Sequence, residues 1–420
     1  MKVTIKPTKL KGNINIPPSK SMSHRAVIAA ALSEGHSQVE NLIFSQDITA
    51  TCDAMQNFGV HINKYDDRID VFSKGKMKTP LHPVDCHESG STLRFLVPFG
   101  AIVDEPVVFE GRGKLTTRPL TPYFDIFEEQ SIRYEYKDQL PLVVEGELQP
   151  GRFEIPGDIS SQFITGLMFV LPLLKGDSEI VITSPLESKG YIDLTLEVLK
   201  EFDIEVENQN HEVYRIKGNQ KYKSGAYRVE GDYSQAAFWV VAGLIGDELC
   251  LNDLKMDSLQ GDREVIDIVK RMGGALQIER DRVTVYPSET RGTVIDGSQC
   301  PDIIPVLTVL AALSEGKTEI INASRLRIKE SDRLAAISTE LNKLGAHIEE
   351  KEDGLVIYGK KELTGGVVDS WNDHRIAMSL AVASIRCKGE VTITGSKAIE
   401  KSYPHFFEDF AKLGGNVRAE

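Results

Sequence analysis

Hydrophobic and polar positions follow the period of a helix in some segments of the chain and that of a strand in others. The same order of helical and strand segments occurs six times. Each copy opens with a short polar or glycine-containing stretch, followed by a segment rich in Ala, Leu and Val that predicts a buried helix. A turn and a short apolar run then predict a strand, and a segment that is apolar on one face predicts an amphipathic second helix. The six repeats are Pro18–Phe72, Glu88–Val144, Gly157–Val206, Gly231–Val285, Pro301–Ile357 and Asn372–Val417.

Each repeat contains one clear strand prediction after its first helix. These strands cover Ser37–Glu40, Glu105–Phe109, Ser178–Ile182, Asp247–Leu251, Thr318–Ile321 and Glu390–Ile393. The repeats recur at roughly 70 residues, which is longer than the period of the common solenoids. Because each one mixes helices with strands, the pattern indicates an α/β protein built from six similar units.

The length of 420 residues favours two domains, since single cores seldom grow this large. The opening strand Lys2–Ile5 has no helix before the first repeat, and the sixth repeat lacks a full closing pair of strands. We therefore expect the N-terminus to complete the last repeat. The predicted domains are residues 14–228, with repeats one to three, and residues 1–13 with 229–420, with repeats four to six.

Composition narrows the class of protein. Lys plus Arg is 49 and Asp plus Glu is 62, a net charge of −13, which disfavours binding to nucleic acid. Five scattered cysteines without a C-x-x-C pair are typical of reduced thiols in the cytoplasm. The first residues lack the apolar core of a signal peptide, and no apolar run is long enough to span a bilayer. No metal-binding motif, P-loop or nucleophile elbow is present. We expect a cytoplasmic protein without membrane partner, metal or cofactor.

Candidate chemistry begins at Pro17–Arg25, where Lys20 and Arg25 fall in the first turns of the first predicted helix. Cations are unfavourable at a helix N-terminus because the helix dipole is already positive there. They become favourable when an anion binds to the free N–H groups and the cations close around it. The stretch therefore indicates an anion site.

Similar cations recur at or near the predicted helix N-termini of other repeats. The eight positions are Lys20, Arg25, Arg94, Arg118, Lys329, Arg333, Arg375 and Lys401. If equivalent helices run parallel, their positive ends point the same way, and a cleft between two such domains suits ligands that carry phosphate or carboxylate groups. The fourth repeat has no basic residue at its first helix, so we expect it to be structural.

Nine motifs in order along the chain resemble those of the 5-enolpyruvylshikimate-3-phosphate synthase (3-phosphoshikimate 1-carboxyvinyltransferase) family. They are Lys20-Ser-Met-Ser-His-Arg25, Ser89-Gly-Ser-Thr-Leu-Arg94, Arg118-Pro, Ser160-Ser-Gln162, Ser188-Lys-Gly-Tyr191, Pro301-Asp302, Lys329-Glu-Ser-Asp-Arg333, Asn372-Asp-His-Arg375 and Lys401-Ser-Tyr-Pro. The resemblance implies two similar domains of three βαβαββ units each, an inside-out α/β barrel, with the active site in the interdomain cleft.

The resemblance also implies the reaction and its residues. The enolpyruvyl group of phosphoenolpyruvate passes to the 5-hydroxyl of shikimate 3-phosphate, and phosphate is released, in the pathway to chorismate and aromatic amino acids. Shikimate 3-phosphate is then held by Lys20, Ser21, Arg25, Ser160, Ser161, Gln162, Ser188, Tyr191, Asp302 and Lys329. Phosphoenolpyruvate is held by Lys20, Gly90, Arg118, Gln162, Arg333, Arg375 and Lys401. Further candidates for the site are Arg94, His374 and Asp373, no cofactor is implied, and we expect a monomer.

The reaction requires a base for the 5-hydroxyl and an acid for the methylene carbon of phosphoenolpyruvate. Asp302 and Glu330 match the family positions for these roles, with Lys20 as a third catalytic candidate, and the sequence leaves open which carboxylate transfers which proton. Two positions depart from the family. Arg325 stands where an Asn often contacts shikimate 3-phosphate, and Glu88 stands where Asn is usual. We hypothesise that Glu88 weakens the binding of anionic phosphoenolpyruvate analogues such as glyphosate.

Three other functions compete with this interpretation. A sibling enolpyruvyl transferase acts on UDP-N-acetylglucosamine, but it has a loop cysteine where this chain has Gly113 and Lys-Asn where this chain has Lys20-Ser21. A non-catalytic protein that binds phosphorylated metabolites would have no need of both Asp302 and Glu330. An enzyme that modifies nucleic acid is disfavoured by the net charge.

Overall fold

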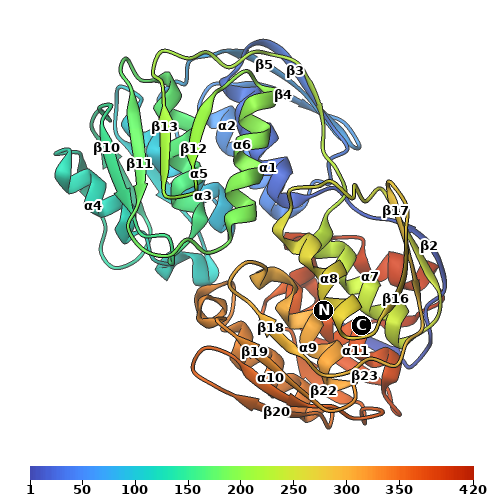
Figure 1. Ribbon diagram of the computed structural model, residues 1–420. Coiled ribbons are helices and arrows are strands. Elements are labelled where there is room, and N and C mark those ends of the chain that lie inside the picture. The colour runs from blue at the N-terminus through green and yellow to red at the C-terminus, as the bar shows by residue number, and fades with distance from the viewer. The chain divides into compact units, whose positions relative to one another are not determined.

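The computed structural model describes residues 1–420, which form two compact units (Figure 1). The N-terminal unit is Lys20–Val229, and the C-terminal unit is Met1–Ser19 with Glu230–Glu420. The predicted boundaries at 14 and 228 are displaced, because residues 14–19 belong to the C-terminal unit. There β2 (Gly12–Asn15) pairs in parallel with β15 (Leu249–Asn252). The predicted position of the active site in a cleft between the domains stays a prediction.

The N-terminal unit contains three four-stranded sheets. In spatial order the first is β14 (Ala226–Arg228), β3 (Glu34–Glu40), β5 (Arg68–Lys74) and β4 (His61–Lys64). The second is β6 (Val84–Asp85), β7 (Val107–Glu110), β9 (Leu142–Glu145) and β8 (Arg133–Glu135). The third is β10 (Arg152–Ile155), β11 (Ser178–Ile182), β13 (Val213–Ile216) and β12 (Val206–Gln209). Its helices are α1 (Lys20–Leu32), α2 (Gln46–Asn57), α3 (Gly90–Leu96), α4 (Thr121–Glu129), α5 (Ser161–Val170) and α6 (Lys189–Glu201).

The C-terminal unit repeats this design with three more sheets. The first is β16 (Ala275–Ile278), β17 (Arg282–Tyr286), β15 and β2, and the second is β18 (Val294–Asp296), β19 (Lys317–Ile321), β21 (Leu355–Tyr358) and β20 (His347–Glu350). The third is β22 (Gly366–Asp369), β23 (Val391–Thr394), β1 (Lys2–Lys6) and β24 (Asn416–Ala419). Its helices are α7 (Tyr233–Ile245), α8 (Glu264–Arg271), α9 (Ile304–Ala312), α10 (Arg333–Lys343), α11 (His374–Ala383) and α12 (Phe406–Lys412).

Every sheet has the same pairing scheme, one parallel pair followed by two antiparallel pairs. The six strands predicted after the first helices are confirmed as β3, β7, β11, β15, β19 and β23, and each forms the parallel pair of its sheet. The scheme recurs because each repeat brings the same order of helix, strand, helix and hairpin. The α/β fold of six similar units is therefore confirmed.

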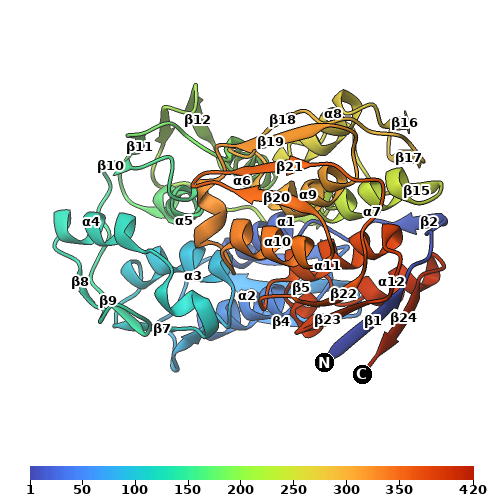
Figure 2. The ribbon, with the colours of Figure 1, turned by 90° about the horizontal axis from the view of Figure 1, so that it is seen from below.

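The N-terminal strand completes the sixth sheet, as the sequence predicted. Strand β1 lies between β23 and β24 and is antiparallel to both, so the two chain ends lie side by side (Figure 2). Two crossing segments supply the missing strands of the first and fourth repeats. Strand β14 pairs with β3 in the N-terminal unit, and β2 pairs with β15 in the C-terminal unit.

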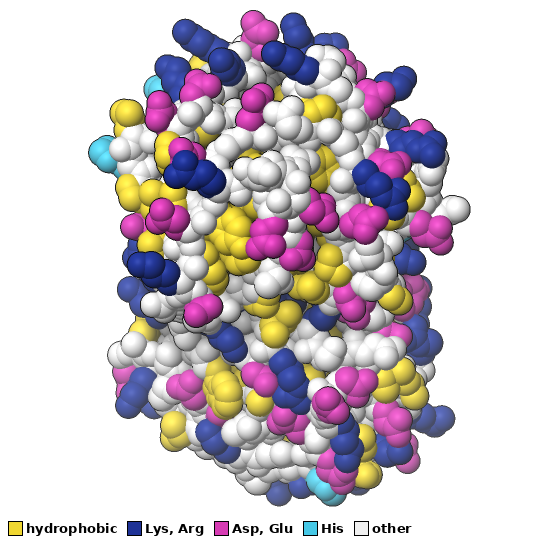
Figure 3. Space-filling view, turned by 90° about the vertical axis from the view of Figure 1, so that its left-hand side faces the viewer, with side chains coloured by type: hydrophobic (Ala, Val, Ile, Leu, Met, Phe, Trp, Pro, Cys, Tyr) yellow, Lys and Arg dark blue, Asp and Glu magenta, His cyan; other side chains and the backbone are white.

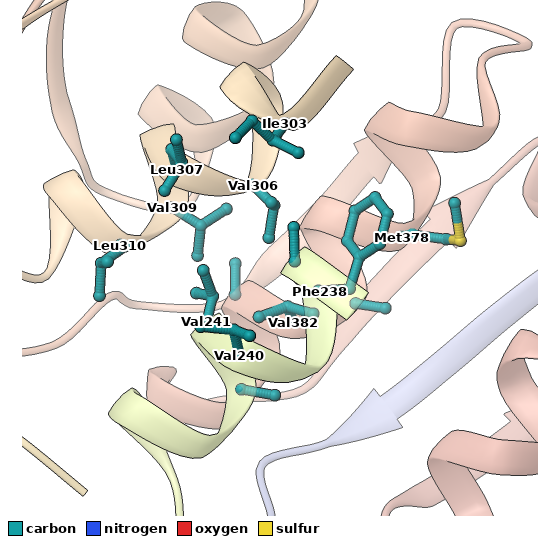
Figure 4. Packing of buried hydrophobic residues seen from close by; sticks show 14 of the residues in the cluster. Phe238, Val240, Val241, Ile303, Val306, Leu307, Val309, Leu310, Met378 and Val382 are labelled. Atoms are coloured by element: carbon teal, nitrogen blue, oxygen red, sulfur yellow. The ribbon is translucent and has the colours of Figure 1, made fainter. Parts of the chain in front are cut away.

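The first helix of each repeat is buried, because it lies inside its unit with the sheets around it. In the C-terminal unit α7, α9 and α11 pack together, with Phe238, Val241, Val306, Val309 and Val382 at their contacts (Figure 4). All residues of α7, α9 and α11 are buried. The second helices α2, α6, α8 and α10 keep a solvent face. The buried helices are thus fixed in position by apolar packing along their length.

The surface carries mixed charges. On the face drawn in Figure 3, acidic and basic side chains are interspersed, and neither sign forms a broad area. Such a face lacks the continuous basic stripe on which nucleic-acid binding depends. No helix is long and apolar enough to cross a membrane.

Candidate active site

In the N-terminal unit, the predicted residues Lys20 and Ser21 open α1, and Lys20 has a carboxylate partner. Its Nζ donates to Oδ2 of Asp47 at 2.8 Å. Asp47 is the second residue of α2 and is buried, so the ammonium of Lys20 is held in one position. Asp47 was not predicted, because a single acidic residue at a helix start is also a common N-terminal charge.

Arg25 is buried, and its guanidinium donates hydrogen bonds to acceptor groups of the protein. It donates through Nε to Thr195 Oγ1 at 2.8 Å, through Nη1 to Ser21 O at 2.7 Å and through Nη2 to Tyr191 O at 2.9 Å. Its guanidinium also lies 5.0 Å from the ring centroid of Phe95. Burial lowers the pKa of Arg25 to about 10. Arg25 thus joins α1 to α6, and its predicted contact with shikimate 3-phosphate stays a prediction.

The start of α5 brings three predicted residues together. Ser160 caps the helix by accepting from Gln162 N, and Ser161 is its buried first residue. Arg94 Nη1 donates to Gln162 Oε1 at 3.0 Å and to Ser160 Oγ at 3.4 Å. Arg94 lies in the last turn of the short helix α3, close to the helix start near which it was predicted. Because it also donates to Pro119 O at 2.9 Å, it ties Gln162 to the turn that carries Arg118.

Gly90 is required by the position of Arg118. A Cβ added at Gly90 would lie 2.5 Å from Arg118 Nη1, so any side chain there must displace the guanidinium. Glu88, two residues earlier, lies against Gly113, where an added Cβ would be 2.6 Å from Glu88 Oε2. The residue that departs from the family pattern is therefore next to the loop that leads to Arg118.

Ser188 stands out by its backbone. It precedes α6 in the left-handed region at φ 56° and is buried. A non-glycine residue in this region is strained, and such strain is maintained only where the surrounding structure enforces it. Tyr191 lies one turn further on, and its carbonyl accepts from Arg25. Tyr191 is thus held by the contact of α1 with α6, and its N–H donates to the carbonyl of Ser188.

In the C-terminal unit, Arg333 binds three carboxylates at once. It donates at 2.8 Å through Nε to Asp373 Oδ2, through Nη1 to Asp302 Oδ1 and through Nη2 to Glu330 Oε2. Arg333 is 1% exposed and Asp373 is fully buried. Burial lowers the pKa of Arg333, but the three carboxylates outweigh it and raise the pKa well above its usual value. One arginine thus fixes both predicted acid–base residues.

Asp302 has further cations around it. Lys329 Nζ lies 3.6 Å from Oδ1, and Arg375 Nη2 lies 3.6 Å from Oδ2. Burial and the neighbouring cations Arg325 and Arg333 lower the pKa of Lys329 to about 8, although Asp302 opposes this. Arg325 is buried in the segment before Lys329. It therefore acts on the cluster through its charge.

The start of α11 delivers the remaining predicted residues. Asp373 caps the helix by accepting from Arg375 N at 2.8 Å, and His374 is buried behind it. Lys401 ends a 3₁₀ turn and donates to Asn372 O at 2.6 Å. Lys401 is the last residue of its 3₁₀ turn and Lys329 follows one, so both lie shortly before an α-helix and not within its first turn.

The fourth repeat contacts this cluster, and the prediction that the repeat is structural stays a prediction. Ser234 O accepts from Arg375 Nη1 at 3.1 Å, while Ser234 Oγ donates to Asp262 Oδ2. Burial and the charge of Asp302 raise the pKa of Asp262 to about 7, with Ser234 and Arg375 acting in the opposite direction. A buried carboxyl group with a raised pKa is a feature of functional sites. A pattern of cations at helix starts gives no signal for Asp262.

No group of three or more His, Cys, Asp or Glu side chains could hold a metal ion. A cavity of about 1050 Å³ in the N-terminal unit lies beside Leu32, Ala101 and Leu173. Leu32 ends α1, whose first residue is Lys20, so the cavity is roughly 20 Å along the helix from the predicted site.

Comparisons with known proteins agree with these motifs. The family model described as EPSP synthase (3-phosphoshikimate 1-carboxyvinyltransferase) matches residues 4–410. The 3-phosphoshikimate 1-carboxyvinyltransferase of Clostridium novyi (strain NT) is 54% identical over 425 residues, 99% of this chain and 98% of the relative. That of Clostridium beijerinckii is 56% identical over 422 residues, 98% of this chain and 97% of the relative. The structure of EPSP synthase from Acinetobacter baumannii has a TM-score of 0.83 at 25% identity and full coverage of both chains. The enolpyruvyl transferase NikO from Streptomyces tendae, at 17% identity and a TM-score of 0.81, shares the fold.

Proposed function

Because the chain belongs to the EPSP synthase (3-phosphoshikimate 1-carboxyvinyltransferase) family, we propose that the two residue clusters described above hold its two substrates. The enzyme transfers the enolpyruvyl group of phosphoenolpyruvate to the 5-hydroxyl of shikimate 3-phosphate and releases phosphate, in the shikimate pathway to aromatic amino acids. The sibling reaction on UDP-N-acetylglucosamine is not favoured, since the relatives of more than half identity carry the shikimate name.

In this proposal, shikimate 3-phosphate binds at the helix starts of the N-terminal unit. Lys20, Ser21, Ser160, Ser161, Gln162 and Ser188 supply an ammonium, hydroxyl groups and an amide. The positive ends of the helix dipoles of α1 and α5 favour a bound phosphate in the same way. Arg25 and Tyr191 hold these residues in position, since their contacts join α1 to α6. Lys329 and Asp302 complete the set from the C-terminal unit.

Phosphoenolpyruvate is assigned to the cations that adjoin the two carboxylates. Arg375 and Lys401 would bind its anionic groups in the C-terminal unit, and Arg118, Lys20 and the Gly90 backbone in the N-terminal unit. Arg333 is also assigned to this substrate, and its three bonds to carboxylates support a second role, which is to hold Asp302 and Glu330 in place.

The chemistry follows from these two carboxylates. One of them accepts the proton of the 5-hydroxyl as its oxygen attacks C2 of phosphoenolpyruvate, and the other gives a proton to the methylene carbon C3. The tetrahedral intermediate then loses a proton from C3 as the bond between C2 and the phosphate oxygen breaks. The observation that carries this proposal is the single buried arginine bound to both Asp302 and Glu330.

The decisive assay measures phosphate released from phosphoenolpyruvate with shikimate 3-phosphate or UDP-N-acetylglucosamine as acceptor. We expect release with shikimate 3-phosphate alone, and a fall in kcat of about 100-fold or more in Asp302→Asn and in Glu330→Gln. Glu319→Gln, which changes an exposed carboxylate on β19 paired only with Lys317, is the control. Release with the sugar nucleotide alone, or full turnover in both site variants, would contradict the proposal.

We also propose that the enzyme acts as a monomer in the cytoplasm. The large apolar side chains that are most exposed, Leu81, Val367 and Met1, lie on separate segments, which supports a surface without a subunit interface. Five unpaired cysteines fit a reducing compartment. Light scattering on the purified chain tests the monomer, since a dimer would double the measured mass.

A further inference from the structure

Glu340 is a buried carboxylate outside the set of predicted site residues. It lies on α10, seven residues after Arg333, and its side chain is 1% exposed. It accepts from Trp371 Nε1 at 2.7 Å, from Asp369 N at 3.0 Å and from Lys343 Nζ at 2.9 Å. A buried charge is retained only where such donors compensate its lost hydration. Two of the three donors belong to one segment, the turn that leads into α11.

This turn has a strained backbone. Trp371 and Asn372 are consecutive non-glycine residues in the left-handed region, at φ 53° and 52°. A bulky residue rarely adopts this conformation, and it is maintained only where the surroundings enforce it. The bonds within the turn are Trp371 N to Asp369 Oδ1 at 2.7 Å and Asn372 N to Ser370 Oγ at 3.2 Å. Glu340 restrains the turn from outside at Asp369 and Trp371, and Thr394 O and Gly395 O restrain it at Ser370.

The turn places two groups of the proposed phosphoenolpyruvate site. Its Asn372 carbonyl accepts from Lys401 Nζ at 2.6 Å. The next residue, Asp373, accepts from Arg333 Nε and from Arg375 N. A shift of the turn would therefore move Lys401 and Arg375 together.

Glu340 and Arg333 attach the turn to the same face of α10, because residues seven apart lie about two helical turns apart on one side. Arg333 holds the turn at Asp373, and Glu340 holds it at Trp371 and Asp369. Two attachment points about 10 Å apart fix both the position and the direction of a short segment. Ser370 also holds the turn, through its bonds to Thr394 O and Gly395 O, so the loss of Glu340 would loosen the Trp371 side of the turn and leave its other attachments in place.

We propose that Glu340 and Trp371 are positioning residues that hold Lys401 and Arg375 in the geometry required for phosphoenolpyruvate. This inference rests on the proposed assignment of that substrate to Lys401 and Arg375. Neither residue touches a substrate in the proposal, and both act through the turn between them.

The test compares variants that remove one bond each. Trp371→Phe keeps an aromatic ring and deletes the indole N–H, and Glu340→Gln keeps the shape of the side chain and removes its charge. We expect the KM for phosphoenolpyruvate to rise about three- to tenfold in both, since one charge-assisted hydrogen bond is lost. The KM for shikimate 3-phosphate should change less than about twofold. Lys343→Met is the matched control, because it removes the other partner of Glu340 and leaves the turn untouched.

The melting temperature is measured for each variant, because Trp371 is partly exposed and its N–H can be deleted without opening the core. Lys401→Met tests the assignment on which the inference depends. If Lys401→Met raises the KM for phosphoenolpyruvate while Trp371→Phe and Glu340→Gln do not, the positioning role is wrong and the assignment stands. If Lys401→Met has no effect, the assignment itself fails, and the inference fails with it. An equal rise in both substrates' KM would also overturn it, since a general loss of structure predicts that result.

Discussion

Replacement of Arg333 by lysine keeps the charge and removes the planar fork, which makes it a sharp test of the cluster. Arg333 makes three bonds of 2.8 Å to three different carboxylates. A lysine ammonium is a single point of donors and cannot span all three, so we expect it to keep one bond and lose two. Each hydrogen bond to a charged group contributes about 1.5 kcal/mol or more, so the expected loss is about 3 kcal/mol.

That loss should appear in two measurements. Since about 1.4 kcal/mol is a factor of ten, kcat/KM should fall roughly 100-fold if the loss falls on the transition state. For a unit of this size the same loss in stability lowers the Tm by about 6–12 °C. Arg327→Lys is the control, because Arg327 also bonds two carboxylates, Asp332 and Glu350, but at a partly exposed site where such pairs contribute under about 1 kcal/mol. Equal effects of the two substitutions on kcat/KM and on Tm would refute this account of the cluster.

Three further predictions follow from the charges of the site. The pKa of Lys329 is lowered to about 8 by burial and by Arg325 and Arg333, so kcat/KM for shikimate 3-phosphate should fall as the pH rises through 8. In Lys329→Arg, where the side chain stays charged, kcat/KM should stay constant up to about pH 10. The pKa of Asp262 is raised to about 7 by burial and by Asp302, so its contribution to stability is present below pH 4 and is lost as the pH rises to 7. The Tm should therefore fall more between pH 5 and pH 8 in the unaltered protein than in Asp262→Asn, and parallel curves would exclude the effect. Glu88→Asn should lower the inhibition constant of glyphosate about two- to fivefold, as expected for one partly exposed charge, and an unchanged constant would show that Glu88 does not repel the inhibitor.

The architecture was predictable from the sequence because it depends on periodicity, which each repeat expresses in its own residues. The six strands that follow the first helices appear where apolar runs lie between turns, and the N-terminal strand was placed in the sixth sheet because that repeat lacked a partner. The boundary near residue 14 was misplaced for a related reason. A short strand such as β2 has no local signal that tells which unit it pairs with, since its partner β15 is more than 200 residues away.

The candidate site was predictable only as far as its motifs extend. Lys20, Arg333 and Arg375 lie at helix starts as expected, because a cation there is unusual enough to be noticed. Asp47, Asp262 and Glu340 were missed, although each is buried against the site or its supports. Acidic residues are common, and only the fold shows that these three are removed from water and bonded to particular donors.

These buried acids give the site its distinctive electrostatics. Lys20 is bonded to Asp47, Arg333 to Asp302, Glu330 and Asp373, and Arg375 lies near Asp302. Cations at helix starts oppose the helix dipole, and the carboxylates remove that penalty while fixing each cation in position. The same carboxylates weaken the attraction of the cations for an anionic substrate. The arrangement therefore favours fixed geometry over maximum charge, which suits catalysis, because preorganised groups stabilise a transition state without first having to reorganise.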